Sequence, residues 1–238
     1  MPRLLILNPN TSESVTALLA GHARRQLAAS WDVVARTARF GAEYIASEAA
    51  YAIAGHAVLD AWAAEPEGAD VVLIGCFGDP GLHALQELSP VPVIGLAEAA
   101  MREATAHGRF SIVTGGERWR PMLKRLAAGL ELPLASVHTL VESGPQLAAD
   151  PEGALTRLAQ ECHAACLADK SESVILGGAA LAGYGDRIAP LTGLKVIDSV
   201  SAGMRAVWTA IEETPAPAGP DGVAYRAVAP ELTAALRS

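Results

Sequence analysis

Residues 71–82 read VVLIGCFGDPGL, and this stretch decides the fold. The four apolar residues Val71–Ile74 are typical of a strand that is buried on both faces, as in a parallel sheet covered by helices. A turn rich in glycine, aspartate and proline follows the strand and begins at Cys76. A helix is expected directly afterwards, near Leu82–Leu88. The stretch therefore predicts one strand–turn–helix unit of a parallel α/β fold.

The same alternation of short apolar runs and longer, alanine-rich stretches of helical period continues along the chain. It predicts parallel sheets with helices on both faces. The expected strands are Leu4–Leu7, Val33–Thr37, Val71–Ile74, Val93–Ile94, Phe110–Val113, Leu134–Thr139, Ser173–Leu176 and Lys195–Ile197. The further expected helices are Ser12–Ala29, Ser47–Ala63, Arg118–Ala128, Pro151–Ala168, Ala202–Ile211 and, after a Pro/Gly linker at Pro215–Gly222, Pro230–Arg237.

The expected elements form two similar sets. VIGLAEAAMR at residues 93–102 aligns with VIDSVSAGMR at residues 196–205, at an offset of 103. Two further pairs match in the same order: Val72–Cys76 with Val174–Gly178 at an offset of 102, and Arg3–Ile6 with Arg109–Ile112 at an offset of 106. Three blocks in one order at nearly one offset predict a duplicated unit of about 100 residues.

The repeat sets the expected domain organisation. We expect an α/β fold of two pseudo-symmetric parallel-sheet halves, the first formed by residues 1–98 and the second by residues 99–211. Residues 212–238 should complete the first half, with the final helix packed on it. Ligands of open α/β sheets bind at the carboxyl ends of the strands, so the active site is expected in the cleft between the halves.

The composition limits the class of protein. The chain has 238 residues, of which 51% are hydrophobic, so a disordered chain is excluded. A net charge of −8 without Lys/Arg clusters argues against nucleic-acid and anionic-membrane partners, and no apolar run reaches the roughly 20 residues of a membrane span. Three cysteines make no disulfide framework and no signal peptide precedes the first strand, so we expect a soluble, cytoplasmic protein.

Cys76 is the strongest candidate for chemistry. A thiol at the start of this turn meets backbone N–H groups and the positive end of a helix dipole, which lower its pKa and favour the thiolate. The glycines of the turn let backbone amides approach an anion closely. Packing as a small, buried core residue is the alternative for Cys76.

Other polar residues follow predicted strands. Asn10 and Thr11 join the first strand to the first helix, where they can donate hydrogen bonds to a carboxylate or imide oxygen. Thr11 or Ser12 can also cap that helix. Thr114 lies in the equivalent turn of the second half and has the same two interpretations. Tyr44, in the loop after the second strand, is either a pocket aromatic or a core residue.

Cys162 and Cys166 lie four residues apart on a predicted amphipathic helix. No further pair of ligands has metal-binding spacing, so no metal is expected there. Both thiols should pack on the inner face of the helix.

Four motifs resemble those of a known family. They are LILNPNTSESV at residues 5–15, IGCFGDPGL at residues 74–82, VTGGERW at residues 113–119 and VIDSVSAG at residues 196–203. The chain resembles the hydantoin racemase branch of the aspartate/glutamate racemase superfamily, to which arylmalonate decarboxylase and maleate isomerase are related. The resemblance extends from about Leu4 to Ile211. It implies a homo-oligomer that acts on a small-molecule substrate without a metal, pyridoxal phosphate or nicotinamide cofactor.

The resemblance also implies a mechanism. The family has one cysteine at equivalent strand ends of each half, because racemisation needs a base on one face of a carbon and an acid on the other. Cys76 is the first of these thiols by resemblance, and hydrogen-bond donors at the two turns stabilise the enolate that forms. The residues expected to bind the substrate are Asn10, Thr11, Tyr44, Phe77, Gly78, Asp79, Thr114, Gly178 and Ala179.

The chain departs from the family pattern at Gly178. Relatives read Leu-Gly-Cys-Ala-Gly where this chain reads LGGAA at residues 176–180, and the internal repeat also makes Gly178 the equivalent of Cys76. Loss of one of two acid/base groups should slow two-base racemisation by roughly 10²–10⁴-fold. A one-face decarboxylation or a cis–trans isomerisation is then an alternative, and Tyr184 or Asp186 is an alternative source of the second proton. A protein that binds its ligand without turnover is the remaining hypothesis.

Overall fold

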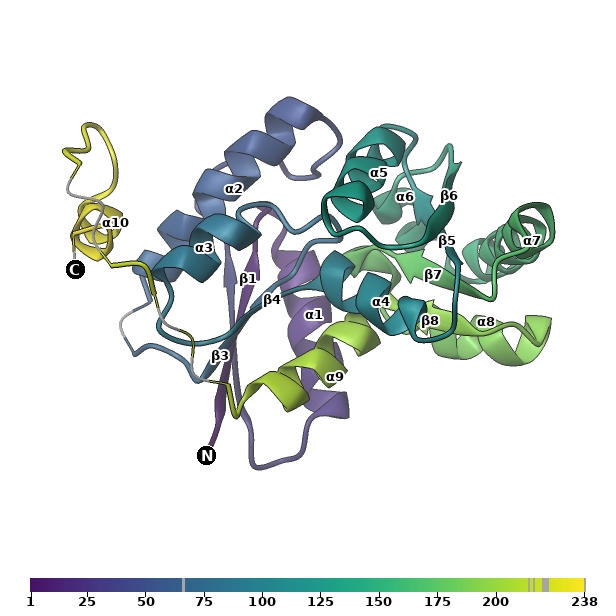
Figure 1. Ribbon diagram of the computed structural model, residues 1–238, viewed down its shortest axis with the longest axis horizontal. Coiled ribbons are helices and arrows are strands. Elements are labelled where there is room, and N and C mark those ends of the chain that lie inside the picture. The colour runs from purple at the N-terminus through teal and green to yellow at the C-terminus, as the bar shows by residue number, and fades with distance from the viewer. Residues whose placement is uncertain (66, 214, 216, 220–222, 238) are drawn as a thin grey trace. The chain divides into compact units, whose positions relative to one another are not determined.

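The computed structural model describes residues 1–65, 67–213, 215, 217–219 and 223–237 (Figure 1). The chain forms two compact units. The first comprises Met1–Gly75, Asp79–Ile94 and the described residues from Ala206 onward, and the second comprises Cys76–Gly78 and Gly95–Arg205. The three residues Cys76–Gly78 thus belong to the second unit, although only Gly75 separates them from strand β3 of the first.

The first unit is built on a four-stranded sheet with the strand order β2-β1-β3-β4, in which β1 runs parallel to both of its neighbours. Apolar side chains of β1 and β3, among them Leu5 and Ile74, pack with Val58 of α2 and Leu85 of α3. The strands are β1 (Arg3–Asn8), β2 (Asp32–Thr37), β3 (Val71–Ile74) and β4 (Val93–Gly95), and the helices are α1 (Glu13–Gln26), α2 (Glu48–Ala63), α3 (Leu82–Leu88) and α10 (Pro230–Ala235).

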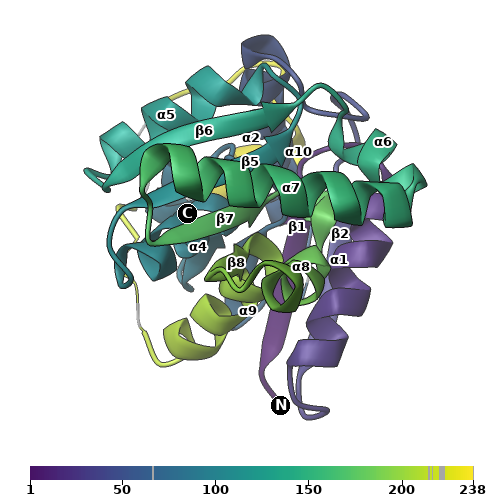
Figure 2. The same cartoon turned by 90° about the vertical axis from the view of Figure 1, so that its right-hand side faces the viewer.

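The second unit repeats this plan with the order β6-β5-β7-β8, again with parallel neighbours. Figure 2 shows α7 lying across this sheet, where it contacts β5, β6 and β7. The strands are β5 (Phe110–Gly115), β6 (Leu134–Leu140), β7 (Ser173–Gly177) and β8 (Val196–Asp198). The helices are α4 (Leu96–Thr105), α5 (Trp119–Gly129), α6 (Gly144–Ala149), α7 (Pro151–Asp169), the 3₁₀ turn η1 (Ala179–Leu181), α8 (Tyr184–Thr192) and α9 (Ser199–Ala210), whose last turn belongs to the first unit.

The two sheets have the same strand order: β5, β6, β7 and β8 take the places in the second sheet that β1, β2, β3 and β4 take in the first. The expected α/β fold of two similar parallel-sheet halves is confirmed, and each expected strand lies within two residues of an observed one. The final helix, α10, packs on α2 of the first unit. The linker expected at Pro215–Gly222 lies partly outside the described residues.

Three helices, α4, α6 and α8, have no counterpart among the expected elements. The first follows β4 directly, without turn residues that would mark its start. The second has only six residues and depends on a capping box between Ser143 and Gln146. The third contains Pro190, a residue that usually ends a helix. Local caps and tertiary contacts, which periodicity does not report, determine these short helices.

One buried carboxylate fixes the start of α9 and of α8. Asp198 is 4% exposed, and its Oδ1 accepts hydrogen bonds from the backbone N–H groups of Val200 and Ser201, both at 3.0 Å. Its Oδ2 accepts from the N–H groups of Gly183 at 2.8 Å and Gly185 at 3.2 Å. A negative charge that caps two helix N-termini is favourable for both dipoles. This cap also explains why α9 begins at Ser199, three residues before its expected start.

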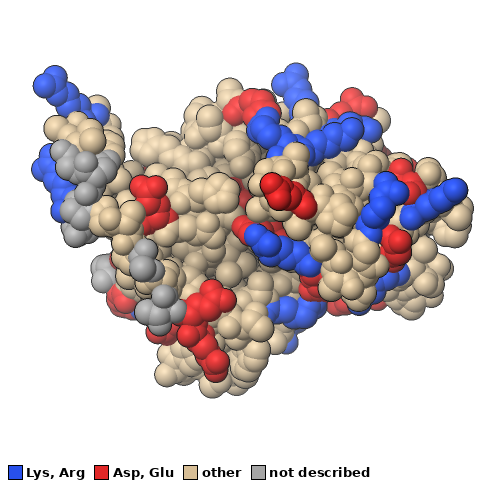
Figure 3. Space-filling view, viewed as in Figure 1, with Lys and Arg blue, Asp and Glu red and all other residues tan. Residues whose placement is uncertain are grey.

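The distribution of charge on the surface and the length of the helices are relevant to nucleic-acid and membrane partners. On the face in Figure 3, Lys and Arg side chains are scattered among Asp and Glu side chains. Of the helices that the structure describes, none combines the length and the apolar character that a bilayer crossing needs.

We predict that Asp198→Asn lowers the free energy of unfolding by about 2–4 kcal/mol, because the amide NH₂ group would face two backbone donors and leave them unpaired. Urea unfolding followed by circular dichroism measures the loss. The matched control is Asp186→Asn, an exposed carboxylate in the first turn of α8, which should change the value by less than about 0.5 kcal/mol. Equal losses in the two variants would contradict the proposed role of Asp198.

Candidate active site

The turn that carries Cys76 has an unusual backbone. β3 ends at Ile74, and the residues that follow include Gly78 with φ of 151° and Asp79 with φ of 55°. Both values lie in the region of positive φ that glycine adopts readily and other residues adopt rarely. The turn therefore needs a glycine at position 78 and holds Asp79 in a strained conformation. Cys76 is 7% exposed and Asp79 is 3% exposed. The thiol therefore lies at the carboxyl end of a strand, largely shielded from water, and the lowered pKa expected for it stays a prediction.

Two aromatic rings hold this turn in the second unit. The ring of Phe77 lies against Gly177, at the end of β7, so closely that a Cβ atom on Gly177 would overlap it. The ring of Trp119, at the start of α5, lies against Gly78, and a Cβ atom there would be 2.5 Å from Cζ3 of the indole. Both rings are buried, with 4% and 6% of their surface exposed. Only glycine fits at positions 78 and 177, and the position of the Cys76 turn depends on both contacts.

These contacts bring several of the predicted site residues together. Thr114 of β5 is the direct neighbour of Gly177 in the sheet. Gly178 follows Gly177, and Ala179 begins the 3₁₀ turn η1. The carboxyl ends of β5 and β7 thus lie beside Phe77, within one compact unit. Sequence reasoning missed Trp119, whose only signal was its place after the Thr114 turn.

Gly178 has a backbone shaped for glycine. Its φ is 141°, a value that other residues rarely adopt. A Cβ atom there would meet only the side chain of Leu181, at 3.5–3.6 Å, which is ordinary van der Waals contact. The N–H of Gly178 donates to Oγ of Ser199 at 3.2 Å. The site has room for a side chain at this position, but its backbone conformation opposes one.

Neither alternative proton source, Tyr184 or Asp186, lies within 4 Å of the position that a Cβ atom on Gly178 would take. Tyr184 packs in a core cluster with Leu158 and Ile188, and the guanidinium carbon of Arg187 lies 5.8 Å from its ring centroid. Burial raises the pKa of Tyr184 above its usual value, which disfavours the ionised form. Asp186 is exposed to solvent in the first turn of α8.

The remaining predicted residues belong to the first unit. Asn10 is 8% exposed, and its Oδ1 accepts a hydrogen bond from the N–H of Ser12 at 2.9 Å. Ser12 is the N-cap residue of α1, as one interpretation expected, but its side chain makes no capping hydrogen bond. The N–H of Thr11 donates to the carbonyl of Ala42 at 3.1 Å, which ties this turn to the loop that carries the half-buried Tyr44. That these residues share one site with Cys76 stays a prediction.

Cys162 packs on the inner face of α7, as expected. It is fully buried, and burial raises the pKa of its thiol to about 12. Cys166, one turn later, is partly buried against the same cluster, and its pKa is also raised by burial. Among the residues that the structure describes, no three His, Cys, Asp or Glu side chains gather as they would to hold a metal ion.

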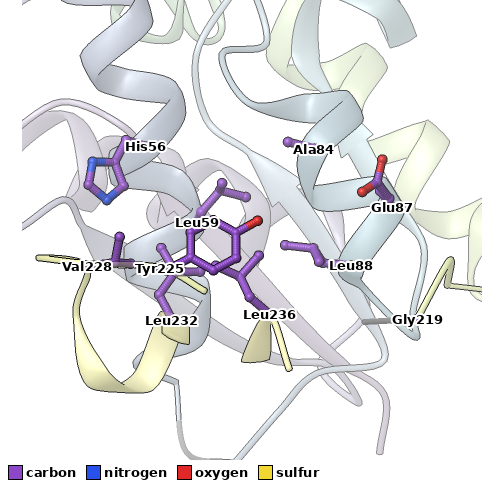
Figure 4. Close-up of a pocket in the computed structure, with 10 residues that line it drawn as sticks. All are labelled: His56, Leu59, Ala84, Glu87, Leu88, Gly219, Tyr225, Val228, Leu232 and Leu236. Carbon is purple, nitrogen blue, oxygen red and sulfur yellow. The ribbon is translucent and has the colours of Figure 1, made fainter. Parts of the chain in front are cut away.

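A cavity of about 390 Å³ lies in the first unit, between α2, α3 and the C-terminal segment (Figure 4). Its walls include Leu59, Leu88 and Leu232, together with the side chains of His56 and Glu87. None of the predicted site residues lines this cavity.

Comparisons with known proteins identify the family. The family model for Asp/Glu/hydantoin racemase matches residues 4–207. Over 215 residues the chain is 31% identical to a hydantoin racemase of Pseudomonas sp. (strain NS671), covering 88% of this chain and 86% of that protein. The solved structure of allantoin racemase from Klebsiella pneumoniae superposes with a TM-score of 0.91 at 31% identity, over 98% of this chain and 99% of that one.

A more distant structure shares the fold. The crystal structure of arylmalonate decarboxylase superposes with a TM-score of 0.66 at 17% identity, over 95% of this chain and 96% of that one. The match to the family model over most of the chain, and relatives above 30% identity, confirm the resemblance seen in the motifs. The chain belongs to the Asp/Glu/hydantoin racemase family and is an isomerase of the racemase type.

Proposed function

We propose that this protein moves a proton at C5 of a 5-substituted hydantoin, with the Cys76 thiol as the acid/base group and without a cofactor. The observation that carries the proposal is the position of Cys76 at the carboxyl end of β3, in a turn fixed by Phe77 and Gly78 against the second sheet. The relatives named hydantoin racemase and allantoin racemase support the substrate class, because allantoin is itself a hydantoin with a substituent at C5.

The chemistry needs a base and an oxyanion site. The thiolate of Cys76 takes the C5 proton, the electron pair of the C–H bond moves into the ring, and negative charge collects on the neighbouring carbonyl oxygen. Hydrogen-bond donors aimed at that oxygen lower the barrier. The backbone N–H groups of Phe77 and Gly78, with the side chains of Asn10 and Thr114, are the donors that we assign to this role. The proton then returns to C5 from the thiol.

Gly178 makes the two faces of the substrate unequal. With a thiol on one face only, return of the proton to the same face is faster than delivery to the other. We therefore expect exchange of the C5 hydrogen with solvent to outrun racemisation. The same asymmetry suits a decarboxylation, in which loss of CO₂ leaves a carbanion that the Cys76 thiol protonates on one face. This lyase activity is the second candidate function.

Proton NMR in deuterated buffer tests the proposal, with single enantiomers of 5-substituted hydantoins and amino acids and with prochiral disubstituted malonates. In the wild type the C5–H signal of a hydantoin should vanish faster than its optical activity. Cys76→Ala should lower this exchange by at least about 10²-fold, and the matched control Cys166→Ala, a partly buried thiol on α7, should not.

Exchange that survives in Cys76→Ala would contradict the assignment of the thiol. Cys76-dependent loss of CO₂ from a malonate, without exchange on any hydantoin, would establish the lyase instead. Ligands that raise the melting temperature of the wild type without any exchange or CO₂ loss would identify a binding protein.

A second prediction concerns Gly178. Gly178→Cys should raise the rate of racemisation relative to exchange, because it returns an acid to the other face. It should also cost about 1–3 kcal/mol of stability, because a φ of 141° strains any residue with a Cβ atom. Gly178→Ala is the matched control, since it has the same strain without a thiol. Polarimetry and NMR on L-5-methylhydantoin measure the two rates, and equal ratios in the two variants would contradict the prediction.

We also propose that the protein works in the cytoplasm as a homo-oligomer. None of its three cysteines forms a disulfide in the structure, which suits a reducing compartment, and the family resemblance supports assembly. Sedimentation velocity should give a multiple of the 24.6 kDa chain mass, and cell fractionation should recover the protein with cytoplasmic markers. A mass equal to one chain, or recovery outside the cytoplasm, would contradict the corresponding part of this proposal.

A further inference from the structure

A buried asparagine organises the turn between β1 and α1. Asn8 is the last residue of β1 and has no exposed surface. Its Oδ1 accepts a hydrogen bond from the N–H of Asn10 at 3.3 Å. Its Nδ2 lies 2.9 Å from Oδ1 of Asn10, and 3.0 Å from both the carbonyl of Ser12 and Oγ1 of Thr16. All of these contacts lie within the first unit.

Main-chain groups fix which way this carboxamide points. A backbone N–H can only donate a hydrogen bond and a backbone carbonyl can only accept one. The N–H of Asn10 therefore requires the oxygen of Asn8 on its side, and the carbonyl of Ser12 requires the NH₂ group on the other. Rotation of the Asn8 carboxamide by 180° would break both bonds.

The same logic fixes the side chain of Asn10. Its Oδ1 accepts from the N–H of Ser12 at 2.9 Å and from Nδ2 of Asn8 at 2.9 Å. The oxygen is thus used within the turn. None of the residues that the structure describes accepts a hydrogen bond from Nδ2 of Asn10, and this residue is 8% exposed. The group that Asn10 offers outside its own turn is an NH₂ donor.

We propose that Asn8 is a positioning residue that makes Asn10 a donor toward the substrate. The atom that meets Asn10 is then a carbonyl oxygen of the hydantoin ring, and a ring N–H or an ammonium group is rejected there. This inference rests on the proposed proton transfer at C5, because the hydrogen bond from Asn10 strengthens only as negative charge forms on the ring oxygen. A donor to a developing oxyanion stabilises the transition state more than the ground state, so it acts on kcat more than on KM.

Asn8→Asp tests the proposal with almost no change of shape. A carboxylate cannot donate to Oδ1 of Asn10 and attracts its NH₂ group instead, so the Asn10 carboxamide should turn its donor inward. With L-5-methylhydantoin we expect kcat for C5 exchange to fall by about 10–10²-fold and KM to change by less than about threefold. The matched control is Thr37→Val, which removes the hydroxyl 2.6 Å from Oγ1 of Thr16 at the outer end of the network and should leave kcat within about twofold.

Asn10→Asp is the second variant. Its carboxylate still accepts from Ser12 and Asn8, so the turn keeps its hydrogen bonds and only the outward donor is lost. The same fall in kcat is expected. Unchanged kcat in either folded variant, while Cys76→Ala removes exchange, would overturn the positioning role and leave the proposed proton transfer by Cys76 standing.

A readout without turnover separates the two proposals further. In ¹⁵N NMR of the ligand-free wild type, the side-chain NH₂ of Asn8 should exchange slowly with solvent, because both hydrogens are bonded, whereas that of Asn10 should exchange rapidly. Addition of hydantoin should protect the Asn10 NH₂ in the wild type. If the wild type shows no activity, this protection still supports the donor role, and its absence overturns it.

Discussion

The fit of two aromatic rings onto two glycines is the constraint on which the candidate site depends. Phe77 lies on Gly177 and Trp119 lies on Gly78, and neither glycine has room for a Cβ atom. Through these contacts a turn that leaves a strand of the first unit becomes part of the second. Cys76 is the chain neighbour of Phe77 in this turn, and Phe77 lies against Gly177 at the carboxyl end of β7, the edge at which parallel α/β sheets bind ligands.

The turns at Cys76 and Gly178, which follow equivalent strands of the two units, have different chemistry, although both have a defined backbone conformation. One carries a thiol, and the other has Gly178 in a backbone conformation that suits no other residue well. The N–H of Gly178 donates to Oγ of Ser199, and the neighbouring Asp198 carboxylate accepts from four backbone N–H groups at the starts of α8 and α9. Both the backbone conformation and the hydrogen bond of Gly178 are thus defined by its surroundings. The proposed one-face chemistry follows from the absence of a thiol at this position.

Much of this fold could be predicted from the sequence because its strands are buried on both faces and read as continuous apolar runs. The repeat even paired β3 with β7, which have the same place in their sheets, and so paired Cys76 with Gly178. What the sequence could not reveal depends on tertiary contact. The partner of Phe77 lies 100 residues further along the chain, and Asn8 resembles an ordinary loop residue until its hydrogen bonds are known.

The ring-on-glycine contacts also bear on how a duplicated protein evolves. Two positions are free to change separately only while neither side chain fills space that the other would need. Here the ring of Phe77 occupies the space that a side chain at Gly177 would take, within one compact unit although the two residues lie 100 positions apart. Positions 77 and 177 should therefore covary among homologues, a larger residue at one appearing with a smaller one at the other.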